Sequence, residues 1–380
     1  MSAIGASNVT AKPERFASLD MFRGATIFLM IVVNTAGAGG AFTQLQHAPW
    51  IGFTLADLIY PSFLFAVGNA MSFALTRPMA ESVFLRRVFK RAALIFLLGV
   101  LMYWFPFVTH QADGSWVAKP FADTRLTGVL QRIALCYLLG ALCARYLRPS
   151  HLLLAAIGLC VAHWAILVGL SPVGEAFGRY RNAGTLFDLW LIGPDHLYRK
   201  DHGFDPEGLL GTLPATANVM AGYLTGLAIQ RWGKHTATVG RLVAIGACLV
   251  LVALLLSPVL PIGKKLWTGS FVALTIGIDL ILLGAVLSLV EVRGVRFGRS
   301  FLQMLGRNPL AIYLFSEMLV VALELIHVQP DTGLYSWIGE HLFQAVAPGP
   351  MGSLLCALAY TLICCAFGRE LDRRGIILKV

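Results

Sequence analysis

A histidine, an asparagine and an aspartate lie close together in the chain, at a break between two apolar runs. Asn34 ends the first run, His47 stands within residues 46–52, and Asp57 opens the next run. A neutral imidazole accepts a proton near pH 7, and a carboxylate ten residues later orients it if the connection folds back. A side-chain amide stabilises a developing oxyanion. We therefore take His47, Asn34 and Asp57 as catalytic candidates; the alternative is that a histidine beside Trp50 only anchors the chain at an interface.

Further polar side chains interrupt the apolar runs. An ionisable group inside such a run is costly unless it is paired or faces water, so each is a functional candidate. They are Arg132, Asp279, Glu317 and Glu324, with the amides of Asn69, Gln131 and Asn218. The alternative is that Arg132 and one acid form a buried structural pair, for which Asp279 is a candidate partner. Two Asp-His pairs, at 195–196 and 201–202, lack a third ligand at helical spacing, so we expect no metal site.

The elements that hold these residues are helices in a membrane. The 380 residues are 57% hydrophobic and 13% charged, against roughly 25% charged in soluble domains, which excludes a soluble enzyme. Recurring apolar runs are near the roughly 20 residues that span a bilayer. They predict an all-α bundle of about ten transmembrane helices: 20–37, 56–76, 90–107, 126–146, 151–170, 209–230, 240–260, 266–290, 308–328 and 350–368.

The basic residues predict the orientation of this bundle. Of the 30 Lys and Arg, 21 fall on the side of the two termini, and such residues are retained in the cytoplasm. We expect a cytoplasmic segment 1–19, one transmembrane domain 20–368 and a cytoplasmic tail 369–380. The net charge of +10 is thus a topology signal, and we expect no nucleic-acid partner. All seven cysteines lie in apolar runs, which is typical of packing residues and not of disulfides.

The one long extracytoplasmic loop, residues 171–208, combines aromatic, charged and amide side chains. Such surfaces suit a sugar, although an ordered loop that only caps the bundle has the same composition. We take four residues in and near this loop as substrate-binding candidates: Trp50, Trp190, Asp205 and Glu207.

Several stretches of the chain resemble the membrane-embedded heparan-α-glucosaminide N-acetyltransferase family and its bacterial relatives. The matching stretches run from residue 15 to about 320 in the family's order, so the resemblance covers most of the chain. They are Arg15–Gly24, Val33–Asn34, His47–Gly68, Gly128–Arg132, Asp205–Thr212 and Gly306–Tyr313.

This resemblance implies transfer of acetyl from cytosolic acetyl-CoA to the amino group of a glucosamine across the membrane. The family's essential histidine falls on His47, and its asparagine near the thioester falls on Asn34. The animal lysosomal members carry an extra lumenal domain that we do not find here. We therefore expect a bacterial inner-membrane protein that acts on a free amino sugar or a cell-wall fragment.

The chemistry of the reaction assigns roles to the remaining candidates. His47 takes the amine proton directly, or attacks the thioester and carries the acetyl group in a two-step reaction. Gln131 and Arg132 would line the path of the pantetheine arm. Basic residues near the cytoplasmic ends of the first three helices would hold the nucleotide phosphates, or serve topology alone: Arg23, Arg86, Arg87, Lys90 and Arg91.

Two other functions remain open from the sequence. An amino-sugar permease also has a helical bundle with polar groups inside, and it would not bind acetyl-CoA. A transferase of this architecture that uses another acyl group is the second. Assembly as a homodimer is also left open.

Overall fold

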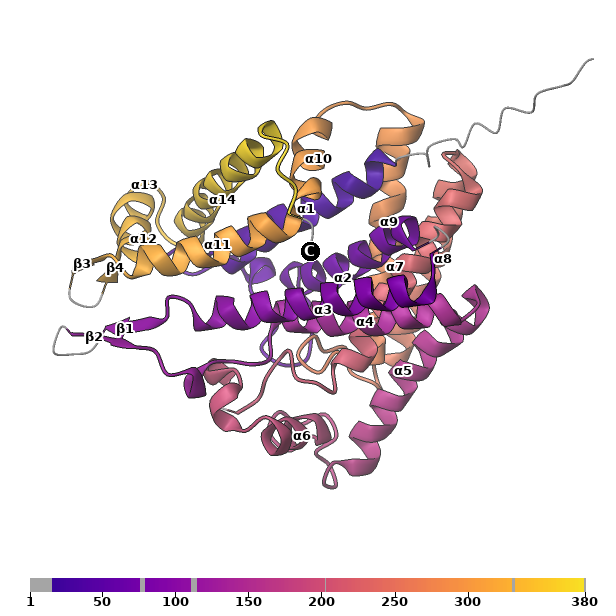
Figure 1. Cartoon of the computed structure of the whole chain (residues 1–380), viewed down its shortest axis with the longest axis horizontal. Helices are drawn as coiled ribbons and strands as arrows, with labels where there is room; N and C mark the ends of the chain where they lie inside the picture. Colours follow the sequence, from indigo (N-terminus) through magenta and orange to yellow (C-terminus); the bar gives the residue numbers. More distant parts are fainter. Residues whose placement is uncertain (1–15, 76–78, 111–114, 202, 330–331, 379–380) are drawn as a thin grey trace, which may run out of the picture.

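The computed structural model describes residues 16–75, 79–110, 115–201, 203–329 and 332–378. The described chain is mostly helical, with long helices packed side by side and short elements at their ends (Figure 1). Four of the 21 basic residues counted on the side of the termini lie outside the described part: Lys12, Arg15, Arg77 and Lys379. So does His202 of the second Asp-His pair.

Each of the apolar segments predicted from the sequence coincides with a long helix. These are α1 (Ala17–Asn34), α2 (Leu55–Ala74), α3 (Glu81–Trp104), α4 (Val129–Tyr146), α5 (Pro149–Leu170), α7 (Thr212–Trp232), α8 (Thr236–Leu256), α9 (Gly269–Leu287), α11 (Pro309–Glu324) and α14 (Pro350–Arg373). Proline opens α5, α11 and α14, at the first helical position, where its missing N–H costs nothing.

Six helices of the described chain are long and apolar enough to cross a membrane. They are α1, α4, α5, α8, α9 with the π-helical turn η5 (Ser288–Val292) that extends it, and α14. All seven cysteines lie in the described part of the chain and are free thiols there. The membrane character predicted from composition is therefore supported, while a count of about ten spans remains a prediction.

The loops hold more structure than the sequence predicted. Two small antiparallel hairpins depart from a purely helical fold: β1 (Val108–His110) pairs with β2 (Trp116–Ala118), and β3 (His327–Gln329) pairs with β4 (Thr332–Gly333). The remaining α-helices of the described residues are short: α6 (Ala183–Leu191), α10 (Arg299–Arg307), α12 (Leu334–Ile338) and α13 (Gln344–Val346). Four 3-10 turns lie in the loops: η1 (Thr43–Leu45), η2 (Phe121–Asp123), η3 (Pro194–His196) and η4 (Arg199–Asp201). A π-helical turn, η6 (Gly339–Phe343), joins α12 to α13.

Close contact between α2 and α7 forms the centre of the bundle. A Cβ added to Gly222 would lie 2.0 Å from the carbonyl oxygen of Phe65, and one added to Gly68 would lie 1.9 Å from that of Val219. Small residues at such crossings let helix backbones approach closely and pack by van der Waals contact. The pairing fixes α2, and with it the residues at its first turn.

The loops that carry the candidate residues meet at one end of this bundle. The N–H of Gly52 donates to the carbonyl of Ile262 at 2.8 Å, and the indole of Trp50 donates to the carbonyl of Phe177 at 2.8 Å. Gly52 has φ +126°, a conformation that glycine adopts without strain. Residues 35–54, 171–211 and 257–268 therefore form one layer over the ends of the helices.

Candidate active site

The side chains of His47 and Asp57 are in direct contact. His47 Nδ1 lies 2.9 Å from Asp57 Oδ1. The imidazole is 42% exposed, whereas the carboxyl group is fully buried. The connection between the two residues thus folds back, as an imidazole oriented by Asp57 requires. When the Nδ1–H group of His47 donates to Asp57, the lone pair of the ring is on Nε2.

Asp57 is fixed by its position in the first turn of α2. Thr54 is the N-cap residue and Asp57 the third residue of the helix, and together they form a capping box. Asp57 Oδ2 accepts from the backbone N–H groups of Ala48 and Thr54, each at 3.1 Å, and from the Thr54 hydroxyl at 3.0 Å. The same carboxylate therefore begins the helix, holds the chain next to His47 and orients its ring.

A lysine that the sequence interpretation did not select completes the cluster. Lys264 Nζ lies 3.0 Å from both ring nitrogens of His47 and 3.9 Å from Asp57 Oδ1. Equal distances to the two nitrogens place the amine across the ring and not in line with one lone pair. Burial lowers the pKa of Lys264 to about 8, although the Asp57 carboxylate opposes this shift. Its charge therefore changes just above neutral pH.

Trp267 holds the loop that carries Lys264. Its side chain is fully buried, its N–H closes a turn onto the Lys264 carbonyl at 2.9 Å, and its indole donates to Asn218 Oδ1 at 3.1 Å. The ring packs edge-on against Tyr60 at 5.2 Å. Its φ of +55° is rare for a bulky residue and is found mainly where surrounding packing enforces it. The lysine is thus anchored to α2 and α7.

A small cavity of about 80 Å³ joins the candidate residues. It is lined by Met30, Val33, Asn34, His47, Ala56, Ile59, Tyr60, Val129, Glu207 and Lys264. Asn34 Nδ2 donates to Glu317 Oε1 at 3.0 Å. This bond uses one of the two amide hydrogens of Asn34, so the other can donate to a ligand. The cavity thus places an imidazole, an amine, an amide and a carboxylate around one space.

Glu207 reaches the cavity from a buried charged cluster in the long loop. Its carboxylate accepts from Arg125, which also binds Asp205. The Asp205 carboxylate further accepts from the Thr127 hydroxyl and from the N–H groups of Tyr198 and Glu207. Burial raises the pKa of Asp205, but Arg125 holds it below its usual value, so the group stays ionised. Asp205 is away from the cavity lining, and its contacts orient Arg125 and Glu207.

The two tryptophan candidates have different surroundings. Trp50 packs edge-on against Phe204 at 4.8 Å, below the guanidinium of Arg179 at 5.1 Å. Trp190 on α6 is 78% exposed and touches Phe187 with a ring distance of 6.0 Å. The structure therefore brings Trp50 into the layer around the site but leaves Trp190 on its outer surface.

Arg132 and Gln131 lie in the first turn of α4, directly after Val129 of the cavity wall. Arg132 donates to the Gly208 carbonyl at 2.7 Å and lies over the Trp267 ring at 5.0 Å. Asp279 accepts instead from Ser62, so it is not the acid partner that the alternative for Arg132 considered. Within the described residues, Nε and Nη1 of Arg132 and both amide atoms of Gln131 are buried without a hydrogen-bond partner.

The basic cluster lies on two helices. Arg23 on α1 pairs with Asp20 at 3.1 Å. Arg86, Arg87 and Lys90 are exposed on α3, and Arg91 lies over the ring of Tyr137 at 4.7 Å. A role in binding nucleotide phosphates remains a prediction for these residues.

Sequence reasoning missed Lys264, Arg125 and Tyr60 as parts of the site. One signal was available: Lys264 and Lys265 are adjacent lysines on the side of the bundle that the charge count leaves poor in basic residues. Arg125 and Tyr60 carried no such signal, because their roles depend on which loops and helices meet.

Comparison with known proteins gives a consistent picture. A family model described as "Heparan-alpha-glucosaminide N-acetyltransferase, catalytic" matches residues 15–180. The chain is 25% identical to the human heparan-alpha-glucosaminide N-acetyltransferase over 369 residues, and 24% identical to the mouse protein over 364 residues. These alignments cover 82% and 80% of this chain, respectively. They cover 54% of each relative, so the chain spans about half the length of the proteins it matches. The resemblance indicated by the motifs is confirmed as a similarity in sequence: over most of its length this chain resembles the heparan-alpha-glucosaminide N-acetyltransferases.

Proposed function

We propose that this protein is a membrane-embedded N-acetyltransferase that moves acetyl from acetyl-CoA to the amino group of a glucosamine-type sugar. The observation that carries the proposal is the cavity in which His47, Lys264, Asn34 and Glu207 converge. The match of residues 15–180 to the catalytic family model includes His47, Asn34 and Asp57. A permease needs alternating access and no thioester, so binding of acetyl-CoA distinguishes the two functions.

His47 serves as the base in the proposed reaction. The amine nitrogen attacks the thioester carbonyl, so a C–N bond forms and the C–S bond breaks. Nε2 of His47 takes the amine proton and passes it to the departing sulfur, which leaves as the thiol of coenzyme A. Asp57 keeps the proton on Nδ1 and thereby keeps Nε2 free to accept. If His47 attacks first, incubation with acetyl-CoA alone would leave an acetyl group on it, which peptide mass spectrometry detects.

Lys264 and Asn34 are the proposed partners of the oxyanion that forms during attack. Both are donors that line the same cavity as His47. Donors held in place before the reaction stabilise the developing charge without the cost of reorganisation. Lys264 fulfils this role in its charged form, so its low pKa limits the reaction at alkaline pH.

Glu207 is the proposed recognition group for the acceptor amine. Its carboxylate lies in the cavity wall and is held by Arg125. An amino sugar arrives largely as an ammonium ion, which a carboxylate attracts. This ion first releases one proton to solvent, and the neutral amine then attacks. Trp50 lies in the same layer and is the proposed aromatic contact for the sugar ring.

The donor is proposed to enter from the opposite end of the bundle. Coenzyme A is too large and too charged to cross a bilayer, so its nucleotide would stay near the basic residues of α1 and α3. The buried unpaired atoms of Gln131 and Arg132 support this path, because the pantetheine arm carries amides that would satisfy them. This arrangement includes about ten spans, both termini in the cytoplasm and residues 171–208 outside, in a bacterial inner membrane.

The experiment that tests the function uses sealed proteoliposomes of known orientation. Acetyl-CoA is supplied on the terminus side and glucosamine on the side of residues 171–208, and N-acetylglucosamine is measured by mass spectrometry. We expect product on the loop side alone, and none from His47→Ala. Product that requires donor and acceptor on one face would overturn the transmembrane mechanism, and glucosamine transport without acetyl-CoA would favour the permease.

A further inference from the structure

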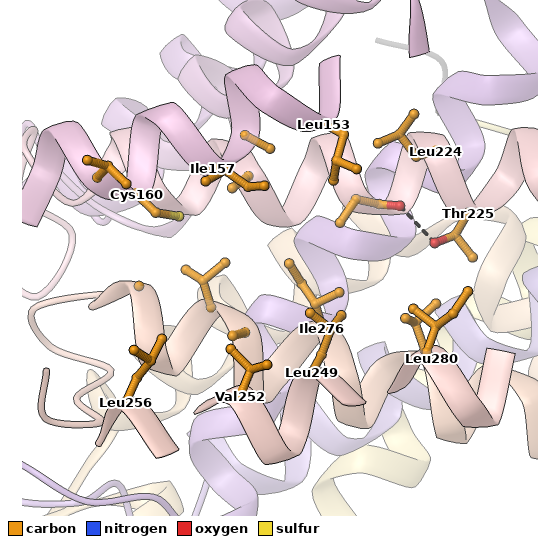
Figure 2. A pocket seen from close by; sticks show the side chains of 18 of the residues that line it. Leu153, Ile157, Cys160, Leu224, Thr225, Leu249, Val252, Leu256, Ile276 and Leu280 are labelled. Carbon is orange, nitrogen blue, oxygen red and sulfur yellow. Dashed lines mark hydrogen bonds between the residues drawn. The ribbon is translucent and has the colours of Figure 1, made fainter. Parts of the chain in front are cut away.

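A large apolar groove lies between α5 and α8, with α7 and α9 at its base. Its volume is about 930 Å³. Figure 2 shows Ile157 and Cys160 of α5 facing Val252 and Leu256 of α8 across an open space. The dimensions suit a hydrocarbon chain, since α8 has 21 residues and is therefore about 31 Å long, close to the thickness of the bilayer core.

The wall of the groove provides almost no polar atom for a ligand. The hydroxyl of Thr225 lines the groove, but it donates to the Ala221 carbonyl at 2.8 Å, as the dashed line in Figure 2 marks. The other residues labelled in Figure 2 are aliphatic apart from the Cys160 thiol. An occupant is therefore held by its hydrocarbon part alone.

One end of the groove lies next to the catalytic cavity. Leu260 lines the groove and is four residues before Lys264, so their Cα atoms are within roughly 14 Å of each other. Gly269 lines the same end, and Trp267 between them packs on Tyr60 of the cavity wall. A chain lying in the groove would thus bring a polar head to the mouth of the site.

The cavity itself has room for the reacting groups only. Its volume of about 80 Å³ is far below the roughly 300–1,000 Å³ of a typical pocket for a small molecule. An acetyl group and an amine fill this space, so the rest of the acceptor must lie outside it. Among the described residues, the groove is a large space that ends at the same loop.

We propose that the acceptor is a lipid-linked amino sugar, whose hydrocarbon chain binds in the groove while its amino group enters the cavity at His47. This inference rests on the proposed acetyltransferase function and names its substrate class. Hydrocarbon bound in the groove raises the local concentration of the sugar at the site without any new polar contact.

The test compares two acceptors with acetyl-CoA in nanodiscs: free glucosamine and dodecyl β-glucosaminide, the same sugar with a twelve-carbon chain. We expect kcat/KM to be at least about tenfold higher for the dodecyl acceptor, because a chain held in the groove keeps the sugar at the mouth of the cavity and raises its local concentration there. Val252→Trp fills the groove from an exposed wall position and should remove this preference while turnover of free glucosamine stays within about twofold. Leu362→Trp, at an exposed position of α14 outside the groove, is the matched control and should keep the preference.

The outcomes separate this inference from the function on which it rests. If neither acceptor is acetylated, the proposed function fails and the inference fails with it. If glucosamine is acetylated but the dodecyl chain gives no advantage, only the inference is wrong. If Val252→Trp lowers kcat/KM equally for both acceptors, the groove holds a structural phospholipid. If Val252→Trp disrupts a dimer and leaves the preference for the dodecyl acceptor unchanged, the groove is covered by a second copy of the chain. Either result overturns the proposal.

Discussion

Replacement of Asp57 by asparagine tests the proposed role of the His47–Asp57 pair. Asp57 Oδ1 accepts a hydrogen bond from the imidazole of His47. Asp57 Oδ2 accepts from the backbone N–H groups of Ala48 and Thr54 and from the Thr54 hydroxyl. The amide of asparagine has only one accepting oxygen. Because the two backbone donors cannot rearrange, that oxygen should stay on them and the NH₂ group should face Nδ1 of His47. The imidazole then has to accept at Nδ1 and carry its proton on Nε2.

In Asp57→Asn the imidazole of His47 should therefore keep its position but carry its proton on Nε2, so that Nε2 cannot act as the base. Loss of a general base costs roughly 10²–10⁴ in rate, or about 3–5 kcal/mol of transition-state stabilisation. We expect Asp57→Asn to lose that factor in kcat, with little change in the KM for acetyl-CoA, because the proposed donor path does not touch Asp57.

The assay follows N-acetylglucosamine formation by purified protein at saturating acetyl-CoA. Thr54→Ala is the matched control, since it removes the other half of the capping box and should lower stability by about 1 kcal/mol while kcat stays within a few fold. Turnover of Asp57→Asn within threefold of the parent protein would refute the tautomer argument. A similar fall in Thr54→Ala would show that the structure of this turn, and not the tautomer, limits turnover.

Further predictions concern charge, packing and sidedness. The pKa of Lys264 is about 8, so this amine loses its proton above that pH and kcat/KM should fall there; Lys264→Arg should move this decline to higher pH, and an unchanged profile would contradict a role for the ammonium. Gly222→Val should lower the thermal unfolding midpoint by several degrees, because its Cβ meets the Phe65 carbonyl, whereas Gly158→Val on α5 meets open space and should be tolerated. A cysteine at the fully exposed Val173, in a cysteine-free background, should react with an impermeant maleimide in intact cells; labelling only in opened membranes would reverse the proposed orientation.

The position of the long helices was predictable because it depends on local composition. A run of about 20 apolar residues forms a helix wherever it is excluded from water, since its backbone groups have no other hydrogen-bond partners. The contact between His47 and Asp57 was predictable for a related reason. Both lie within one connection and the first turn of the next helix, so few conformations bring the chain back on itself.

The loops were less predictable from the sequence. The hairpins β1–β2 and β3–β4 have strands of only two or three residues, too short for an apolar periodicity to mark them. Helix α6 is mostly apolar but has only nine residues, too few to be recognised as a membrane span. Asp205 was selected as a sugar-binding residue from its type and position, but the structure surrounds its carboxylate with donors from four other residues. Residue type alone does not distinguish a carboxylate that faces a cavity from one that is already saturated.

The sequence alone thus predicted a helical membrane protein and a histidine–aspartate pair at its surface, because short-range patterns in the chain are sufficient for both. Only the tertiary structure brings Lys264 to His47 across 217 residues and Glu207 to the same cavity. The physical reason is that contacts between distant loops depend on how the helices pack, and here on the close crossing of α2 and α7 and on the buried Trp267. No local pattern encodes these contacts, so the composition of the site follows from packing.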